Sequence, residues 1–118
     1  MSEATNGTTT VAGEVVEKIA VAAARSVPGV ADLGGDVARF FNSVLDKVGL
    51  DEVGDASRGV SAKVTGNDVT VTVVLVLEAG RVVAEVTAEV QAKVKEALTG
   101  YGLNVVAVNV KVDDISGV

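Results

Sequence analysis

The sequence contains neither cysteine nor histidine, and both absences restrict its chemistry. Without cysteine there can be no disulfide, no thiol nucleophile and no thiolate metal site. Without histidine the chain lacks the usual general base at neutral pH and a common ligand of zinc and copper. Only carboxylates, lysines and one tyrosine are left for acid–base work. The sequence therefore predicts a protein that is not an enzyme and that holds no cofactor and no metal.

Aromatic residues and long apolar runs are also scarce. Tryptophan is missing, and two phenylalanines and one tyrosine stand against 28 valines and 16 alanines. Apolar runs such as Val73–Leu77 are far shorter than the ~20 residues that a membrane-spanning helix needs. Met1–Thr10 lacks the cationic and then apolar pattern of a signal peptide. We therefore expect a cytoplasmic protein without direct membrane insertion.

Positive charge is in the minority, because 10 Lys and Arg stand against 16 Asp and Glu and give a net charge of −6. A sequence-independent hold on nucleic acid needs clustered basic residues, and no basic run is present. No nucleic-acid partner is therefore predicted. An RNA-binding α+β module remains the alternative function, followed by a small-molecule-binding protein.

What the chain does have is valine and alanine at regular spacing. Apolar residues three and four apart predict a first helix that Pro28 and Gly29 end. Val30–Leu33 predicts a short strand after it. The inner face of the first helix is predicted to consist of Ala12, Val15, Val16, Ile19, Ala23 and Val27.

A β-hairpin is predicted around the turn pair Gly66-Asn67, which lies between two runs of alternating polarity. Its second strand continues to about Glu78. Turn chemistry and alternation give the same register. The predicted inward pairs are Val64 with Val69, Ala62 with Val71 and Val60 with Val73.

The last third of the chain predicts a helix from Arg81 to Leu98 and a strand from Leu103 to Val112. A crossover through that helix would make the last strand parallel to the second hairpin strand. The fold class is therefore α+β: a small mixed sheet of three main strands, with a short fourth as an option, and helices mainly on one face. Residues 11–115 are expected to form a single domain, between tails at 1–10 and 116–118. The apolar faces are predicted to be Val83, Val86, Val90, Val94 and Ala97 in the helix and Val106, Val108, Val110 and Val112 in the strand.

Asp36–Val48 has helical spacing and carries both phenylalanines, Phe40 and Phe41, together with Val44. This helix either completes the core or docks on a partner, and the sequence leaves both readings open. Leu50–Gly59 lacks periodicity and is expected to be a loop. On the second hairpin strand, Val74 and Val76 make the nominally polar face apolar, which suggests that this end of the strand is covered.

Acidic residues give no sign of a site. Glu85, Glu89 and Glu96 lie opposite the helical valines and alternate with lysines, which is typical of a solvated face. Asp51–Asp55 lacks the ligand spacing of a calcium-binding loop. Neither group predicts catalysis or metal binding.

Several short motifs follow one another in a fixed order from about Val11 to Ile115. They are Glu14-Val15-Val16, Lys18-Ile19-Ala20, Val27-Pro28-Gly29-Val30, Gly59-Val60, Val90-Gln91-Ala92-Lys93-Val94-Lys95, Leu98-Thr99-Gly100 and Val108-Asn109-Val110. In this order they resemble the alkaline-shock, or envelope stress response, family found mainly in Gram-positive bacteria. The sequence departs from the family pattern at Glu78-Ala79-Gly80, where an aromatic–Gly pair is common, and this departure bears on partner identity.

The resemblance implies an abundant cytoplasmic protein that is linked to cell-envelope stress and forms homo-oligomers. It also implies a location at the inner face of the cell membrane through a separate membrane-anchoring protein, and it transfers no catalytic residue. We therefore predict a non-enzymatic scaffold or adaptor that acts through protein–protein contacts. The predicted partner-binding residues are Phe40, Phe41, Val44, Val74 and Val76.

Overall fold

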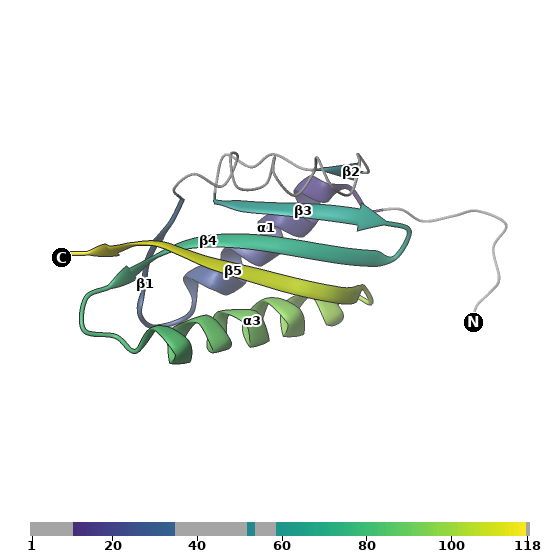
Figure 1. Ribbon diagram of the computed structural model, residues 1–118. Coiled ribbons are helices and arrows are strands. Elements are labelled where there is room, and N and C mark those ends of the chain that lie inside the picture. The colour runs from purple at the N-terminus through teal and green to yellow at the C-terminus, as the bar shows by residue number, and fades with distance from the viewer. Residues whose placement is uncertain (1–10, 35–51, 54–58, 118) are drawn as a thin grey trace, which may run out of the picture.

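The computed structural model describes residues 11–34, 52–53 and 59–117. These residues form two helices and a five-stranded sheet (Figure 1). The predicted helix at 36–48 lies outside the described residues. The bounds are α1 Gly13–Arg25, β1 Val30–Leu33, β2 Glu52–Val53, β3 Val60–Thr65, β4 Asp68–Glu78, α3 Val83–Thr99 and β5 Asn104–Ser116.

The sheet is organised around β4. On one side of β4, strands β3 and β1 pair antiparallel with successive stretches of it, so they lie end to end. On the other side, β5 pairs parallel with the whole length of β4. The short β2 pairs with the outer edge of β3, which corrects the expectation of a loop throughout Leu50–Gly59. The sheet is mixed, and the predicted α+β class is confirmed.

The predicted hairpin is confirmed in its register. Val64 pairs with Val69, Ala62 with Val71 and Val60 with Val73. All six side chains are buried. The turn works because Gly66 adopts a positive φ of 62°, which glycine reaches without steric cost.

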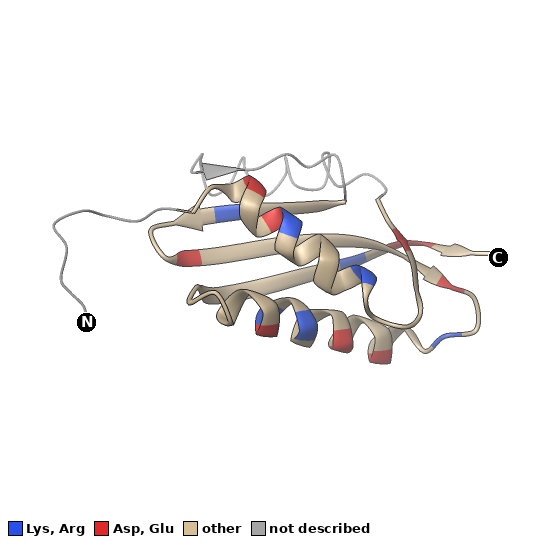
Figure 2. Ribbon diagram, turned by 180° about the vertical axis from the view of Figure 1, so that it is seen from behind, with Lys and Arg blue, Asp and Glu red and all other residues tan. Residues whose placement is uncertain are grey.

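Helices α1 and α3 contact each other and cover one face of the sheet (Figure 2). The layer between them is built from small branched side chains, as the valine content predicts. Because valine and alanine are short, both helices approach the strands closely and leave no side chain of this layer exposed. The centre of this core consists of Val16, Ala20, Ala24, Val60, Val71, Val73, Leu75, Val90, Val94 and Leu98.

The buried face of α1 differs from the predicted one. Val16, Ala20 and Ala24 are fully buried, whereas Val15 is 47% exposed. Residues four apart form a straight row along a helix, and the two alanines in this row let the helix axis approach the sheet. The sequence pattern therefore predicted the helix and its period correctly, but the buried face is shifted by one residue along the sequence.

Two valines predicted to face inward do not. In β5, the register with β4 shifts between Val105 and Ala107, so Val106 is a bulge residue with 61% exposure. Val105 takes its place against the core. Val83 is also exposed, because it is the first residue of α3 and lies at the end of the helix. The strand also runs to Ser116, beyond the predicted end at Val112.

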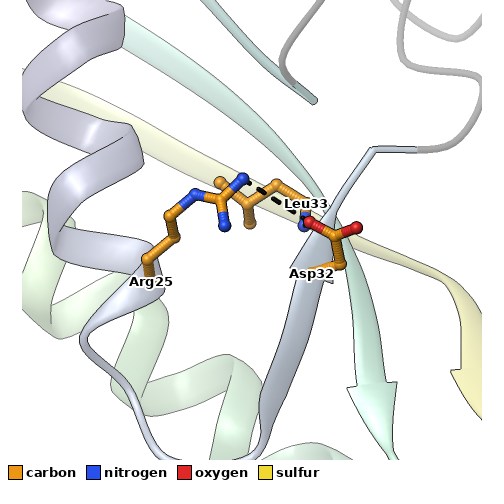
Figure 3. A network of polar contacts seen from close by, with 3 residues as sticks. All are labelled: Arg25, Asp32 and Leu33. Carbon is orange, nitrogen blue, oxygen red and sulfur yellow. Dashed lines mark hydrogen bonds and ion pairs between the residues drawn. The ribbon is translucent and has the colours of Figure 1, made fainter.

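A polar contact joins the end of α1 to β1 (Figure 3). The Arg25 Nη2 lies 3.5 Å from Oδ1 of Asp32, and the same oxygen accepts a hydrogen bond from the Leu33 backbone N–H at 2.8 Å. Both charged side chains are more than half exposed, so the ion pair adds little stability. Asp32 lies beside the bulge in β1, where the register with β4 shifts between Val30 and Asp32.

The sheet face opposite the helices is buried at three positions in its middle. Ser61 and Val74 are fully buried, and Thr72 is almost so. Ser61 and Thr72 are paired across β3 and β4. Among the described residues, the Ser61 hydroxyl has no hydrogen-bond partner. A buried hydroxyl without a partner is destabilising.

Ser61→Ala is therefore expected to raise the free energy of unfolding by about 1 kcal/mol, because it removes an unsatisfied buried hydroxyl. Urea denaturation followed by circular dichroism measures the change. Ser26→Ala is the matched control, since the Ser26 hydroxyl donates to the Ala23 carbonyl at 2.7 Å on the surface. That variant should lose about 0.5 kcal/mol. A loss at Ser61 equal to that at Ser26 would contradict the prediction.

Candidate interaction surface

The five residues predicted to bind a partner are only partly described. Phe40, Phe41 and Val44 lie outside the described residues. Val74 is fully buried on the sheet face opposite the helices, and Val76, on the same face, is half-buried. Val74 exposes no surface in this structure. The assignment of these five residues to a partner interface stays a prediction.

The structure draws attention to a different place, the outer edge of β5. This strand of 13 residues pairs with β4 on one side, and no described strand pairs with its other side. A long strand edge presents unpaired N–H and C=O groups, which can bond to another chain. The edge is visible in Figure 1 as the side of β5 that faces α3.

The alternation of the strands shows which backbone groups point outward. The Val74 N–H donates to Gly59, and the Val74 carbonyl accepts from Gly34, so the backbone of Val74 faces β3 and β1. Backbone groups alternate along a strand, so the N–H and C=O of Val73 must point to β5. The residue of β5 in register with Val73 is Val110. In a parallel ladder, only one residue of each registered pair directs its N–H and C=O to the neighbouring strand. The other residue of the pair points its N–H and C=O away from that strand.

The same alternation applies along the unbulged part of β5. The N–H and C=O groups of Val108, Val110 and Val112 all point to the open edge, while their side chains pack against the core. One of these groups is already engaged, because the Gln91 side chain donates a hydrogen bond to the Val108 carbonyl at 3.1 Å. Gln91 lies on α3, so this helix runs beside the edge.

A shallow groove of about 250 Å³ lies between α3 and β5. Its β5 wall is mostly apolar, and the exposed Val106 belongs to it. Its helix wall is polar and carries one charged side chain, that of Lys95. The lining residues are Gln91, Lys95, Val105, Val106, Ala107 and Val108.

The charges around this surface are mixed. β5 contains one basic residue, Lys111, and two acidic residues, Asp113 and Asp114. The groove contains one charged residue, Lys95. Elsewhere, acidic and basic residues are spread over both helices and the strands (Figure 2). Glu85, Glu89 and Glu96 are exposed, as predicted for a solvated helix face.

Other kinds of site find little support in the described ranges. Within them, no three Asp or Glu side chains gather into a group that could hold a metal ion. Neither of the two described helices is long and apolar enough to cross a membrane. A small cavity of about 120 Å³ lies beside Arg81, which forms an ion pair with Glu78.

The sequence patterns did not predict that Gln91, Lys95 and Val106 lie on one surface. Gln91 and Lys95 are four apart, which places them on one face of a helix. That signal was present, but nothing in the pattern showed that this face would border an open strand. The exposure of Val106 was not predictable, because no local motif indicates the bulge at this residue.

The fold and its open edge define a small α+β domain with a surface suited to binding an extended chain. The chain belongs to the alkaline-shock protein 23 family, which has a cell envelope-related function and whose model matches residues 1–117. The resemblance seen in the sequence motifs is confirmed by this match. The family assignment connects the protein to the cell envelope without naming a partner.

Solved structures with a similar fold include two variants of the MamM CTD, both in a zinc form. Each gives a TM-score of 0.50 over 86% of this chain and 84% of the other, with 18% and 19% sequence identity. At this level of identity the likeness concerns the fold alone. It supports the arrangement of the sheet and helices.

Proposed function

We propose that this protein is a non-enzymatic adaptor of the cell envelope that acts through protein–protein contacts, including contacts between its own copies. The outer edge of β5, with which no described strand pairs, is the observation that carries the proposal, since a strand edge of this length is a template for pairing with another chain. The absence of histidine and cysteine from the sequence favours binding over catalysis.

The proposal places the protein in the cytoplasm, at the inner face of the membrane, where a membrane-anchoring protein would hold it. The family's cell envelope-related function supports this location. The region of Phe40, Phe41 and Val44 is proposed as a second contact surface. Replacing both phenylalanines by serine tests that surface by partner capture, with circular dichroism as the check on folding.

Val110→Pro is expected to weaken partner binding at least about tenfold. Proline removes the outward Val110 N–H without removing a hydrogen bond to β4, and proline is tolerated on edge strands. The measurement is capture of partners from the membrane fraction of native cells by immobilised protein, quantified by mass spectrometry. A membrane-anchoring protein should be retained by wild type and lost by the variant.

Val83→Pro provides the matched control. Val83 is the first residue of α3, where proline is well accepted, and it is not among the residues that line the groove. It should keep the partner. Sedimentation velocity over a concentration series measures contacts between copies. A wild-type protein that stays monomeric at high concentration and captures the same proteins as Val110→Pro would contradict the proposed function.

A further inference from the structure

We propose that the edge of β5 pairs with β5 of a second copy of this chain, antiparallel, about a two-fold axis that passes through Val110. The inference rests on the proposed function and specifies which surface joins two copies and in which register. An interface about a two-fold axis must be complementary to itself, because each contact from one residue to another recurs in the opposite direction. The edge of β5 meets this requirement in its backbone, its side chains and the helix beside it.

The outward backbone groups of β5 are spaced symmetrically about Val110. Every second residue of β4 directs its N–H and C=O to β5, so the residues of β5 in register with them point outward. Their spacing along the sequence is three, two, two and three residues, because one bulge lies at Val106 and the other at Asp113. The outward residues are Val105, Val108, Val110, Val112 and Ile115.

Reversal of the strand about Val110 leaves this spacing unchanged. A second β5 that runs antiparallel therefore brings every outward residue opposite an outward residue: Val110 opposite its own copy, Val108 opposite Val112, and Val105 opposite Ile115. The two bulges face each other, so the register continues past them. The Val108 carbonyl, which already accepts from the Gln91 side chain, can accept a second hydrogen bond because its oxygen has two lone pairs.

The side chains of the five outward residues are apolar, and all are half-buried. The four valines pack against the core on the side of the sheet that faces the helices. Ile115 lies on that side too, because it is in register with the buried Leu77. Residues directly opposite in an antiparallel pair share a face, so an apolar side chain meets an apolar one at each of these positions, and such pairs are stabilising.

The charges of β5 favour this register over a neighbouring one. Lys111 lies opposite Asn109 of the second copy, and the two aspartates of β5 lie opposite uncharged residues. Moving the axis by one residue, to Lys111, would place the two copies of Lys111 directly opposite each other, which is destabilising. It would also bring the bulges out of alignment.

Helix α3 borders the edge, so the two copies of α3 would lie side by side on one face of the joined sheet. The flank of α3 toward the edge carries Gln91 and Lys95, which line the groove. The spacing of three and four residues places Ala84 and Ala88 on the same flank, and both alanines are exposed. Side chains this small let two helix axes approach to about 8 Å.

The alanines lie where the two helices would be closest. Lys95 borders the start of β5 and Gln91 reaches Val108, so α3 runs antiparallel to β5. One helical turn before Gln91, which is about the length of two strand residues, Ala88 therefore lies beside Val110 and the axis. The symmetric spacing, the matched bulges and this small-residue contact are all requirements of a second copy, whereas a strand of an unrelated protein needs none of them.

The absence of cysteine from the chain makes the first test direct, because one introduced cysteine is the only thiol. In full-length Val110→Cys, two thiols meet at the axis with their Cα atoms about 5.5 Å apart, which a disulfide spans. Oxidised glutathione should convert most of the protein to a disulfide-linked dimer, measured by non-reducing electrophoresis.

Val106→Cys is the matched control for this cross-link. Val106 is 61% exposed and more accessible than the half-buried Val110, but two copies of it would lie more than about 20 Å apart in the joined sheet. It should form little dimer. Cross-linking of Val106→Cys as fast as that of Val110→Cys, or of neither variant, would overturn the proposal.

Substitutions at Asn109 test the register through the sign of their effect. Asn109→Asp places a carboxylate opposite Lys111 at two symmetric positions and should lower the dimer dissociation constant at least about threefold, whereas Asn109→Lys should raise it at least about threefold. Sedimentation velocity over a concentration series measures both. Because the chain carries a net charge of −6, total charge alone predicts the opposite order. The opposite order, or equal constants, would refute the register.

The two proposals fail in different ways. If wild type associates or captures a partner that Val110→Pro loses, but Val110→Cys forms no disulfide, the proposed function stands and this inference is wrong. If wild type is monomeric and captures the same proteins as Val110→Pro, the proposed function is wrong as well. If Val110→Cys forms the disulfide while Val110→Pro keeps every cellular partner, the inference stands and the proposed partner contact at this edge is wrong.

Discussion

Gly59→Ala is expected to lower the free energy of unfolding by at least about 2 kcal/mol. Gly59 has a positive φ of 80°, a backbone conformation that costs an L-residue about 1 kcal/mol or more. A Cβ added there would also lie 2.8 Å from the Cα of Gly34 and 2.9 Å from the carbonyl carbon of Leu33. Those atoms are backbone, so no side chain can rotate to make room.

The contact exists because β1 and β3 lie end to end on the same side of β4. The Gly34 N–H donates to the Val74 carbonyl at 3.1 Å, and the Val74 N–H donates to the Gly59 carbonyl at 2.8 Å. The end of β1 and the start of β3 are thus both hydrogen-bonded to the same residue of β4, Val74. Relieving the overlap requires breaking one of these hydrogen bonds, which adds about 1 kcal/mol or more.

Gly80→Ala separates the two contributions. Gly80 has nearly the same φ, 87°, but a Cβ there would meet no atom within 4 Å. It should therefore lose only the conformational part, about 1 kcal/mol. Urea denaturation of the two variants under identical conditions measures the difference. Equal losses would mean that the junction between β1 and β3 is not close-packed.

The hairpin shows when a sequence determines structure at the level of single residue pairs. At Gly66-Asn67 the turn residues and the alternation on both strands indicate the same register, and the structure has that register. Two independent signals converge there. The last helix and its parallel strand were likewise predictable, because their length and period leave few alternatives.

The errors arise where only one signal was present. In α1 both Val15 and Val16 fit an apolar face, and the tertiary packing of the two alanines decides which of them is buried. In β5 the alternation continues through Val106, but the bulge there reverses it. A period describes a regular element, so it cannot report an irregular residue within one.

The candidate surface was harder to predict than the fold. An open strand edge depends on the order of strands in the sheet, and that order depends on long-range pairing. Gln91 became informative only when the structure placed it 3.1 Å from the Val108 carbonyl. Val74 was more predictable, because its apolar character suggested a covered position, and the structure shows it fully buried.

Leu75→Ala should lower the free energy of unfolding by about 3 kcal/mol. Leu75 is fully buried and lies where three strands meet, opposite Leu33 of β1 and Val112 of β5. Truncation leaves a cavity among neighbours that are themselves small, and such a site collapses poorly around the missing atoms. Urea denaturation measures the loss. Val76→Ala is the matched control, because it is adjacent, half-buried and on the other face, and should lose about 1 kcal/mol or less.

This variant also separates stability from binding. Leu75 supports the core beneath β5, but it contributes no group to the open edge, so the folded fraction of Leu75→Ala should capture the same partners as wild type does. Val110→Pro should show the reverse, with binding lost and most of the stability kept. Partner capture at a temperature where both variants are folded makes the comparison. Parallel losses of stability and binding in both variants would mean that the edge is not an independent binding surface.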